Sequence, residues 1–142
     1  MKTICPEDRS AELDLARVLV VDDDPTSRLT LQTVLKAGGY RVDAAASAAE
    51  AVGKMDEQEY ELVLSDLQME SPEAGLKVLA HARMMDYKPA TALVTTYQNM
   101  RPLKTARMLI TPEDIPGLLA KVANLISERA ARRVEREMRH AT

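Results

Sequence analysis

The sequence contains no phenylalanine and no tryptophan, and tyrosine occurs only four times among its 142 residues. Proteins that bind single-stranded nucleic acid stack the bases on aromatic side chains, and such side chains are scarce here. The formal net charge is -3 and the isoelectric point lies near 5.5, whereas nucleic-acid-binding domains are usually basic. We therefore expect no direct binding of DNA or RNA.

Cysteine is almost absent as well, since Cys5 is the only one. A single cysteine forms no intrachain disulfide and gives no thiolate metal site. No apolar run approaches the roughly 20 residues of a membrane span, and residues 1–9 lack the apolar stretch of a secretory signal. We expect a cytoplasmic protein without a membrane partner.

What the chain does contain is typical of a soluble globular domain. Hydrophobic residues make up 46% of the sequence and charged residues 29%. A chain of 142 residues is long enough for one domain with a sizeable core and too short for two. We expect a single folding unit.

Short apolar runs alternate with amphipathic segments along the chain. The pattern predicts strands at 16–21, 41–45, 61–65, 90–94 and 107–110, and helices at 25–37, 47–57, 75–85 and from 112 onward. Strands that alternate with helices favour βαβ units with parallel pairing and right-handed crossovers. The predicted fold class is therefore α/β with a doubly wound parallel sheet.

Acidic residues stand at the ends of two of these strands. Asp22, Asp23 and Asp24 follow the first apolar run, and Asp66 follows the third. The carboxyl ends of neighbouring parallel strands form the crevice where ligands bind, so we expect the carboxylates of Asp22, Asp23 and Asp66 to converge. For Asp24 we favour a role as helix cap that complements the helix dipole.

Three converging carboxylates need either protons or a divalent cation, and Mg²⁺ suits a few carboxylate oxygens completed by water and phosphate. A carboxylate beside bound Mg²⁺ can attack a phosphoryl group in line, because the metal screens the negative charge of both partners. The product of that reaction is an acyl phosphate on aspartate.

Three segments carry a resemblance to a known family. The run 20–25 (VVDDDP), the strand end 64–69 (LSDLQM) and the strand end 94–96 (VTT) resemble the receiver domain of bacterial two-component response regulators, over residues 16–127. The resemblance implies a flavodoxin-like (βα)5 fold with strand order 2-1-3-4-5. It also implies a phosphoprotein in a phosphorelay, with a histidine kinase or phosphotransfer protein as partner.

The resemblance assigns a role to five residues. Asp66 matches the phosphoacceptor, while Asp22 and Asp23 match the acidic pair that holds Mg²⁺ together with Asp66. The backbone carbonyl of Gln68 matches a further metal ligand, and Thr95 matches the switch hydroxyl that reports phosphorylation. Such a protein can catalyse its own phosphotransfer and dephosphorylation without being a dedicated metabolic enzyme.

The sequence also departs from the family pattern. Receivers usually carry Lys-Pro after the fifth strand, and this chain has Thr111 and Pro112, which make a good helix start. Lys104 is a weak substitute for the missing lysine. The stretch 96–110 is short by about two helical turns, so we expect a truncated or absent fourth helix, with Met108 in place of the usual switch aromatic.

We divide the chain into an N-terminal tail (1–15), a receiver domain (16–127) and a C-terminal helical extension (128–142). The extension has a thin apolar stripe of Ala130, Ala131, Val134 and Met138. Two interpretations stay open: a solvated helical tail with opposite-charge pairs, or a contact for a homodimer. It also stays open whether the chain is a stand-alone receiver or part of a longer protein.

Three hypotheses on function follow. The first is a receiver that accepts phosphate on Asp66 and signals through protein contacts. The second is a degenerate receiver that acts as a non-phosphorylated interaction or dimerisation module, since the usual lysine is missing. The third, a hydrolase that uses an aspartyl phosphate, is weaker because such enzymes normally place the nucleophile after the first strand.

Overall fold

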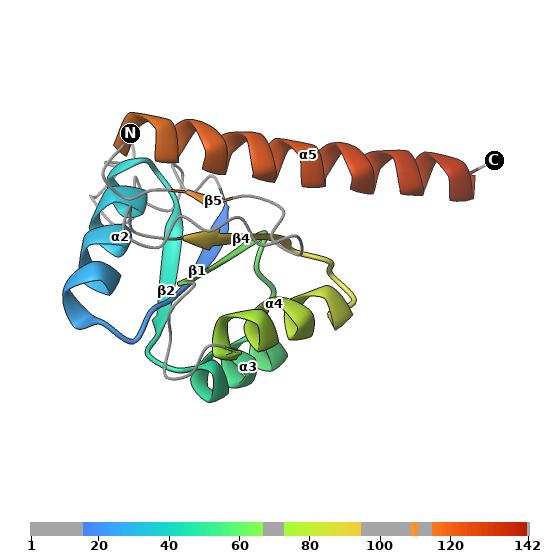
Figure 1. Cartoon of the computed structure of the whole chain (residues 1–142). Coiled ribbons are helices and arrows are strands. Elements are labelled where there is room, and N and C mark those ends of the chain that lie inside the picture. The colour runs from blue at the N-terminus through green and yellow to red at the C-terminus, as the bar shows by residue number, and fades with distance from the viewer. Residues whose placement is uncertain (1–15, 67–72, 95–108, 111–114, 142) are drawn as a thin grey trace, which may run out of the picture.

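The computed structural model describes residues 16–66, 73–94, 109–110 and 115–141. Its centre is a sheet of five parallel strands in the order β2-β1-β3-β4-β5 (Figure 1). This order confirms the predicted fold class. The strands are β1 (Arg17–Val21), β2 (Arg41–Ala45), β3 (Leu62–Asp66), β4 (Ala90–Val94) and β5 (Leu109–Ile110).

Helices cover both faces of the sheet, so the molecule has three layers (Figure 1). One face carries α2 and α5, and the other carries α3 and α4. The truncated helix predicted between residues 96 and 110 falls almost entirely on 95–108, outside the described residues. The helices are α2 (Pro25–Ala37), α3 (Ala48–Glu57), α4 (Ala74–Met84) and α5 (Ile115–Ala141).

The strand β1 explains why two helical layers are needed. Successive side chains of a strand point to opposite faces, and Val18 to Val21 are all buried, so both faces must be covered. Val18 and Val20 belong to one core cluster, Leu19 and Val21 to the other. The first cluster includes Leu31, Leu35, Leu118, Val122 and Leu125 from α2 and α5, and the second includes Ala51, Met55, Val78 and Ala82 from α3 and α4.

The helix α2 begins and ends where local chemistry predicts. The Asp24 carboxylate accepts hydrogen bonds from the backbone N–H of Ser27 at 3.1 Å and from its hydroxyl at 2.8 Å, so Asp24 is the N-cap. At the other end Gly39 has φ 100°, a left-handed conformation that glycine adopts without steric penalty. These two residues fix the length of the helix that follows the acidic run.

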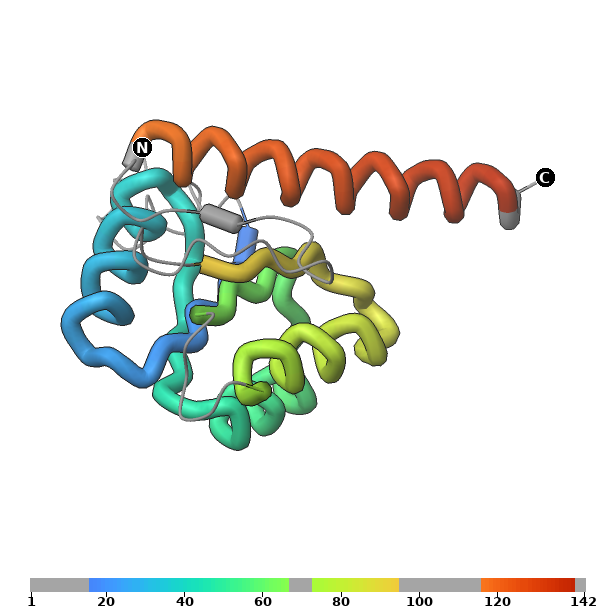
Figure 2. The backbone as a smooth tube through the Cα atoms, viewed as in Figure 1, coloured from blue at the N-terminus to red at the C-terminus, as the bar shows by residue number. Residues whose placement is uncertain are grey.

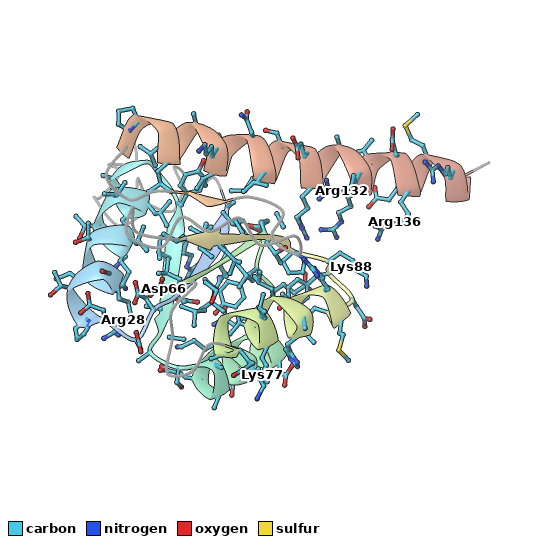
Figure 3. All side chains as sticks on the ribbon, viewed as in Figure 1. Arg28, Asp66, Lys77, Lys88, Arg132 and Arg136 are labelled. Atoms are coloured by element: carbon cyan, nitrogen blue, oxygen red, sulfur yellow. The ribbon has the colours of Figure 1, made fainter. Side chains whose placement is uncertain are left out.

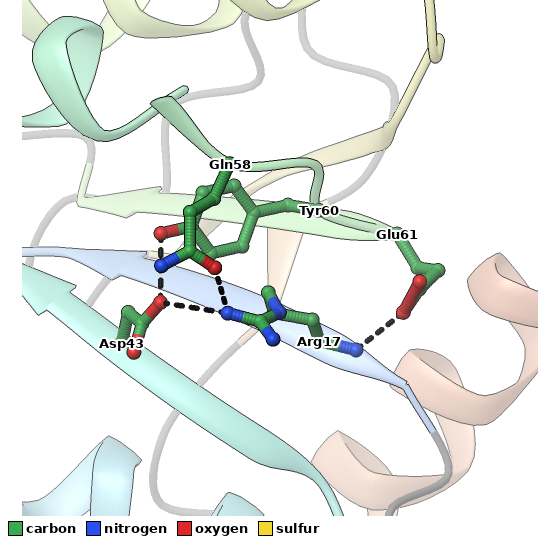
Figure 4. A network of polar contacts seen from close by, with 5 residues as sticks. All are labelled: Arg17, Asp43, Gln58, Tyr60 and Glu61. Atoms are coloured by element: carbon green, nitrogen blue, oxygen red, sulfur yellow. Dashed lines mark hydrogen bonds and ion pairs between the residues drawn. The ribbon is translucent and has the colours of Figure 1, made fainter. Parts of the chain in front are cut away.

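A polar network closes the amino-terminal edge of the sheet (Figure 4). The hydroxyl of Tyr60 donates to Asp43 Oδ2 at 2.8 Å, and Arg17 Nη1 lies 3.7 Å from the same oxygen. Arg17 also donates to the side chain of Gln58, and its backbone N–H donates to the Glu61 carboxylate. Burial, and then the contact with Asp43, raise the pKa of the Tyr60 phenol.

The last helix, α5, continues past the edge of the sheet (Figure 2). Arg129 attaches α5 to the turn before β4: it is 8% exposed and donates to the carbonyls of Lys88 (3.0 Å) and Tyr87 (2.7 Å). Beyond it Val134 and Met138 are 52% and 64% exposed. Within the described residues, no helix combines the length and the apolar character that crossing a membrane requires.

Candidate functional site

The register of the sheet brings two acidic strand ends together. Val21 of β1 pairs with Ser65 of β3, so the next residues, Asp22 and Asp66, stand side by side at the carboxyl edge. Oxygen atoms of Asp22, Asp23 and Asp66 all lie within 4.8 Å of one another. The expected convergence of these carboxylates is confirmed.

Asp22 is the fixed centre of this acidic pocket, which consists of Asp22, Asp23 and Asp66. It is only 3% exposed. Its backbone N–H donates to the Ala45 carbonyl at 3.0 Å, and its Oδ1 accepts from the Asp24 N–H at 2.9 Å. Arg28 Nη1 donates to the Asp22 carbonyl at 2.9 Å, so the segment after β1 is held at three points.

The electrostatics of the pocket favour an added positive charge. Burial raises the pKa of the Asp22 carboxyl, and the neighbouring charges of Asp23 and Asp24 raise it further. Hydrogen bonds with the Asp24 backbone and with the Asp66 carboxyl oppose that rise. Three carboxylates this close together repel one another, and an added proton or cation relieves that repulsion.

The donor set fits Mg²⁺. An octahedral Mg²⁺ holds its oxygen ligands at about 2.0–2.1 Å, so ligands on opposite sides of the ion are separated by about 4 Å. Three carboxylate oxygens that all lie within 4.8 Å of one another are close enough to bind one such ion, directly or through an intervening water. Hard carboxylate oxygens are the ligands this ion prefers. Acidic triads of this kind are typical of the magnesium site of receiver domains.

The other predicted site residues are not located. Gln68 falls in 67–72, Thr95 and Lys104 fall in 95–108, and Thr111 falls in 111–114, all outside the described residues. Conversely, Arg28, labelled in Figure 3, was not among the predicted site residues, although its guanidinium donates to the Asp22 carbonyl. The signal in the sequence that would have indicated it is a cationic residue in the first turns of the helix that follows an acidic run.

Curated relatives resemble this chain over most of its length. It is 35% identical over 98 residues to the gliding motility regulatory protein of Myxococcus xanthus, a match that covers 69% of this chain and 11% of that protein. It is 30% identical over 116 residues to the transcriptional regulatory protein ZraR of Escherichia coli (strain K12), covering 78% and 26%. The chain thus spans about a quarter or less of these relatives.

A solved structure and a family model agree with these relatives. The response regulator TrrA of Thermotoga maritima, solved in complex with Mg²⁺-BeF, is 30% identical and superposes with a TM-score of 0.69, covering 78% of this chain and 99% of that chain. The family model of the response regulator receiver domain matches residues 18–132. With its sheet order and acidic pocket, the chain belongs to the response regulator receiver family of two-component signal transduction.

Proposed function

We propose that this receiver accepts a phosphoryl group on Asp66, with Mg²⁺ held by Asp22, Asp23, Asp66 and the backbone carbonyl of Gln68. The observation that carries the proposal is the convergence of three carboxylate oxygens within 4.8 Å from the ends of β1 and β3. Asp66 is half-buried, at the carboxyl edge where open α/β sheets bind ligands. We therefore assign the role of nucleophile to the Asp66 carboxylate.

The chemistry is an in-line displacement at phosphorus. A carboxylate oxygen of Asp66 attacks the phosphorus of a phosphohistidine donor, the phosphorus–nitrogen bond breaks, and the imidazole leaves with the electron pair. The product is an aspartyl phosphate, which water later hydrolyses to aspartate and inorganic phosphate. When bound, Mg²⁺ supplies screening of the charge on the phosphoryl oxygens. Asp22, fixed at three points, keeps the metal ligands in register with Asp66.

Phosphorylation would signal by adding a nearly doubly charged group at a strand end. In this proposal the hydroxyl of Thr95, the residue after β4, turns toward the phosphoryl oxygens. Thr111 stands where receivers usually have lysine, so the phosphoryl group lacks that ion pair. We expect phosphorylation with a weaker link between Asp66 and Thr95 than in receivers that have the lysine.

Receiver domains partner histidine kinases, and we propose a histidine kinase or a phosphotransfer protein as the donor to Asp66. We also propose the same division of the chain: a tail at residues 1–15, the receiver at 16–127 and the helical extension at 128–142. The output would be a changed protein contact, and the exposed stripe with Val134 and Met138 is one surface for it.

The experiment is phosphorylation by a small acyl-phosphate donor. Incubation with acetyl phosphate and Mg²⁺ should give one phosphoryl adduct in the intact-mass spectrum, which EDTA prevents. The adduct should be absent in Asp66→Asn. Asp24→Asn is the matched control, because it removes a charge from the same acidic run yet keeps a good N-cap. An adduct that persists in Asp66→Asn would contradict the assignment.

A second candidate is a receiver that has lost phosphorylation and serves as an interaction module. Thr111 in place of lysine and the exposed Val134 and Met138 favour it. Wild-type protein that gives no adduct with acetyl phosphate, and none with a histidine kinase, would support this candidate over the first.

A further inference from the structure

A second pocket lies at the amino-terminal edge of the sheet, the edge opposite the acidic pocket. It has a volume of about 390 Å³ and is lined by the end of α4, the turn that leads into β4, and α5. We call it the arginine pocket. Six basic side chains and one acidic side chain line it: Arg83, Lys88, Arg129, Arg132, Arg133 and Arg136, with Asp86.

The basic side chains come from separate elements that the fold brings together. Arg132 and Arg136 extend from α5 toward the turn that carries Lys88 (Figure 3). Arg129 lies one turn earlier on the same helix and is buried. It donates to the carbonyls of Tyr87 and Lys88. The turn and the helix are thus fixed relative to each other before any ligand arrives.

The turn itself is held in an uncommon conformation. Lys88 has φ 44°, in the left-handed region that residues with a Cβ rarely adopt. Its side chain donates to the Arg83 carbonyl at 2.8 Å, and its own carbonyl accepts from Arg129 at 3.0 Å. Strained residues that the surroundings hold in place are common at ligand-binding sites.

The charge of the pocket is poorly balanced within the protein. Arg133 reaches Glu137 at 3.8 Å, but among the described residues neither Arg132 nor Arg136 has an acidic group within ion-pair distance. Arg132 and Arg136 are four residues apart on α5, a spacing at which like charges destabilise a helix. A chain with a net charge of -3 therefore concentrates positive charge at this one pocket.

Desolvation adds to this repulsion. Burial lowers the pKa of the Arg129 guanidinium; Glu61 and Glu59 oppose that change, and the charges of Arg133 and Arg132 reinforce it. An anion inside the pocket would relieve the repulsion that these arginines feel. Guanidinium groups are planar forks that pair with two oxygens at once, the geometry that phosphate and carboxylate offer.

We propose that the arginine pocket binds a small ligand with two or more phosphoryl groups. A phosphoryl monoester carries nearly two charges at neutral pH, so two or three of them match the cationic lining. A carboxylate carries one, and several acidic side chains would have to enter one cavity of about 390 Å³ to do the same. That volume lies within the range of about 300–1,000 Å³ found for small-molecule sites.

The first experiment is calorimetric titration of the full chain with inorganic tripolyphosphate and, separately, with ATP. We expect saturable binding of one ligand per chain. The double variant Arg132→Gln/Arg136→Gln should weaken it at least tenfold, since glutamine keeps the side-chain bulk and the helix propensity without the charge. The matched control is Arg139→Gln, on the same helix and outside the pocket lining.

Further arms identify the source of the phosphoryl groups. Phosphatidylcholine vesicles containing a phosphoinositide should bind the wild-type chain and not the double variant if the ligand is a lipid headgroup, and should bind neither if it is soluble. Asp66→Asn should bind tripolyphosphate as the wild type does, which separates this site from the phosphoacceptor. Equal affinity of wild type and double variant, or tighter binding of an oligoglutamate or a DNA duplex than of tripolyphosphate, would overturn the proposal.

Discussion

At the scale of single residues, the acidic pocket lowers the stability of the metal-free fold and provides ligands for a cation. Asp22 is buried beside the carboxylates of Asp23 and Asp66, so the fold places three acidic groups close together. Burial and neighbouring charge raise the pKa of Asp22, which means that the folded state disfavours its ionised form. Asp22 therefore lowers the stability of the metal-free fold, and its proposed role in binding Mg²⁺ accounts for its presence there.

Asp22→Asn should therefore stabilise the metal-free protein and remove its response to Mg²⁺. Asparagine keeps an oxygen for the Asp24 N–H and loses the charge. In the wild type, Mg²⁺ at a hundred times its dissociation constant should stabilise the fold by about 2.7 kcal/mol. Thermal unfolding with Mg²⁺ and with EDTA measures both effects. An equal Mg²⁺-induced rise in Tm in the two proteins would contradict the metal assignment of Asp22.

Tyr60→Phe should destabilise the protein by about 1 kcal/mol, because it removes the hydrogen bond to Asp43 from a phenol that is 1% exposed. The raised pKa of Tyr60 means that the native state keeps its proton at a pH where the unfolded state, with a pKa of about 10, has lost it. The stability that protonated Tyr60 contributes is fully present below the unfolded pKa. It is lost as the pH rises from there through the higher pKa of the folded state.

Urea unfolding near pH 8 and near pH 11 tests this linkage. The wild type should lose more stability between the two values than Tyr60→Phe does. Tyr87→Phe is the comparison, since burial raises the pKa of Tyr87 to about 12 and its hydroxyl donates to the Met55 carbonyl at 2.9 Å. An alkaline loss of equal size in the wild type and in both variants would exclude a tyrosine origin.

Contacts between residues near in sequence, and the convergence of acidic residues at strand ends, could be predicted, whereas other contacts between distant residues could not. Asp24 caps α2 through Ser27, three positions away, so the sequence alone predicted the cap. Tyr60 and Asp43 are 17 positions apart and meet only through the register of the sheet. Arg129 and Lys88 are 41 positions apart, and no pattern in the sequence joins them.

At the scale of helices and strands, local chemistry set most boundaries. The predicted helix 47–57 begins at a cap, since Ser47 Oγ accepts from the Glu50 N–H at 3.1 Å. The Glu50 carboxylate turns back to the N–H of Ala46 at 2.8 Å, one residue before the usual partner. The predicted strand 90–94 is observed unchanged, and the described part of the predicted strand 107–110, Leu109–Ile110, is a strand.

The attachment of α5 to the turn before β4 rests on Arg129, and Arg129→Met should weaken it. Methionine retains apolar packing but leaves the carbonyls of Tyr87 and Lys88 without their charged donor. Hydrogen bonds to charged groups contribute about 1.5–3 kcal/mol each, and water entering at this edge recovers part of that. We expect a loss of about 2 kcal/mol in the free energy of unfolding, measured by urea titration.

Arg132→Met is the control for this loss, because it changes an exposed arginine one turn further along α5. It should leave the free energy of unfolding within about 0.5 kcal/mol of the wild type. Equal destabilisation by the two variants would show that α5 is held by general charge effects and not by the two carbonyls.

At the scale of the whole molecule, opposite charges occupy opposite edges of one sheet. The carboxylates of the acidic pocket stand at the carboxyl ends of β1 and β3, and the arginine pocket lies before the amino end of β4. The first was predictable because strand ends are visible in the sequence. The second was not, because its arginines on α5 and the turn before β4 are distant in sequence and meet only in the folded structure. A ligand at one edge therefore need not compete with phosphorylation at the other.

The distal part of α5 carries the surface on which we test for a homodimer. It extends past the sheet (Figure 2), and Val134 and Met138 remain exposed on it. If a second copy covers this stripe, the dimer should be weak, because a stripe of a few residues buries far less than the roughly 1,200–2,000 Å² of a stable interface. Val134→Gln/Met138→Gln should then lower the dimer population seen by sedimentation at increasing protein concentration.

Glu135→Gln controls for any change in charge on the same stretch of helix, since it lies beside the stripe and breaks only the pair with Arg139. It should leave the association unchanged. Adding acetyl phosphate and Mg²⁺ shows whether phosphorylation of Asp66 reaches this helix: a shift toward dimer in the wild type, and none in Asp66→Asn, would connect the two ends of the molecule. If wild type and Val134→Gln/Met138→Gln sediment identically at every concentration, the distal helix is a solvated tail, and the signal leaves the domain through another surface.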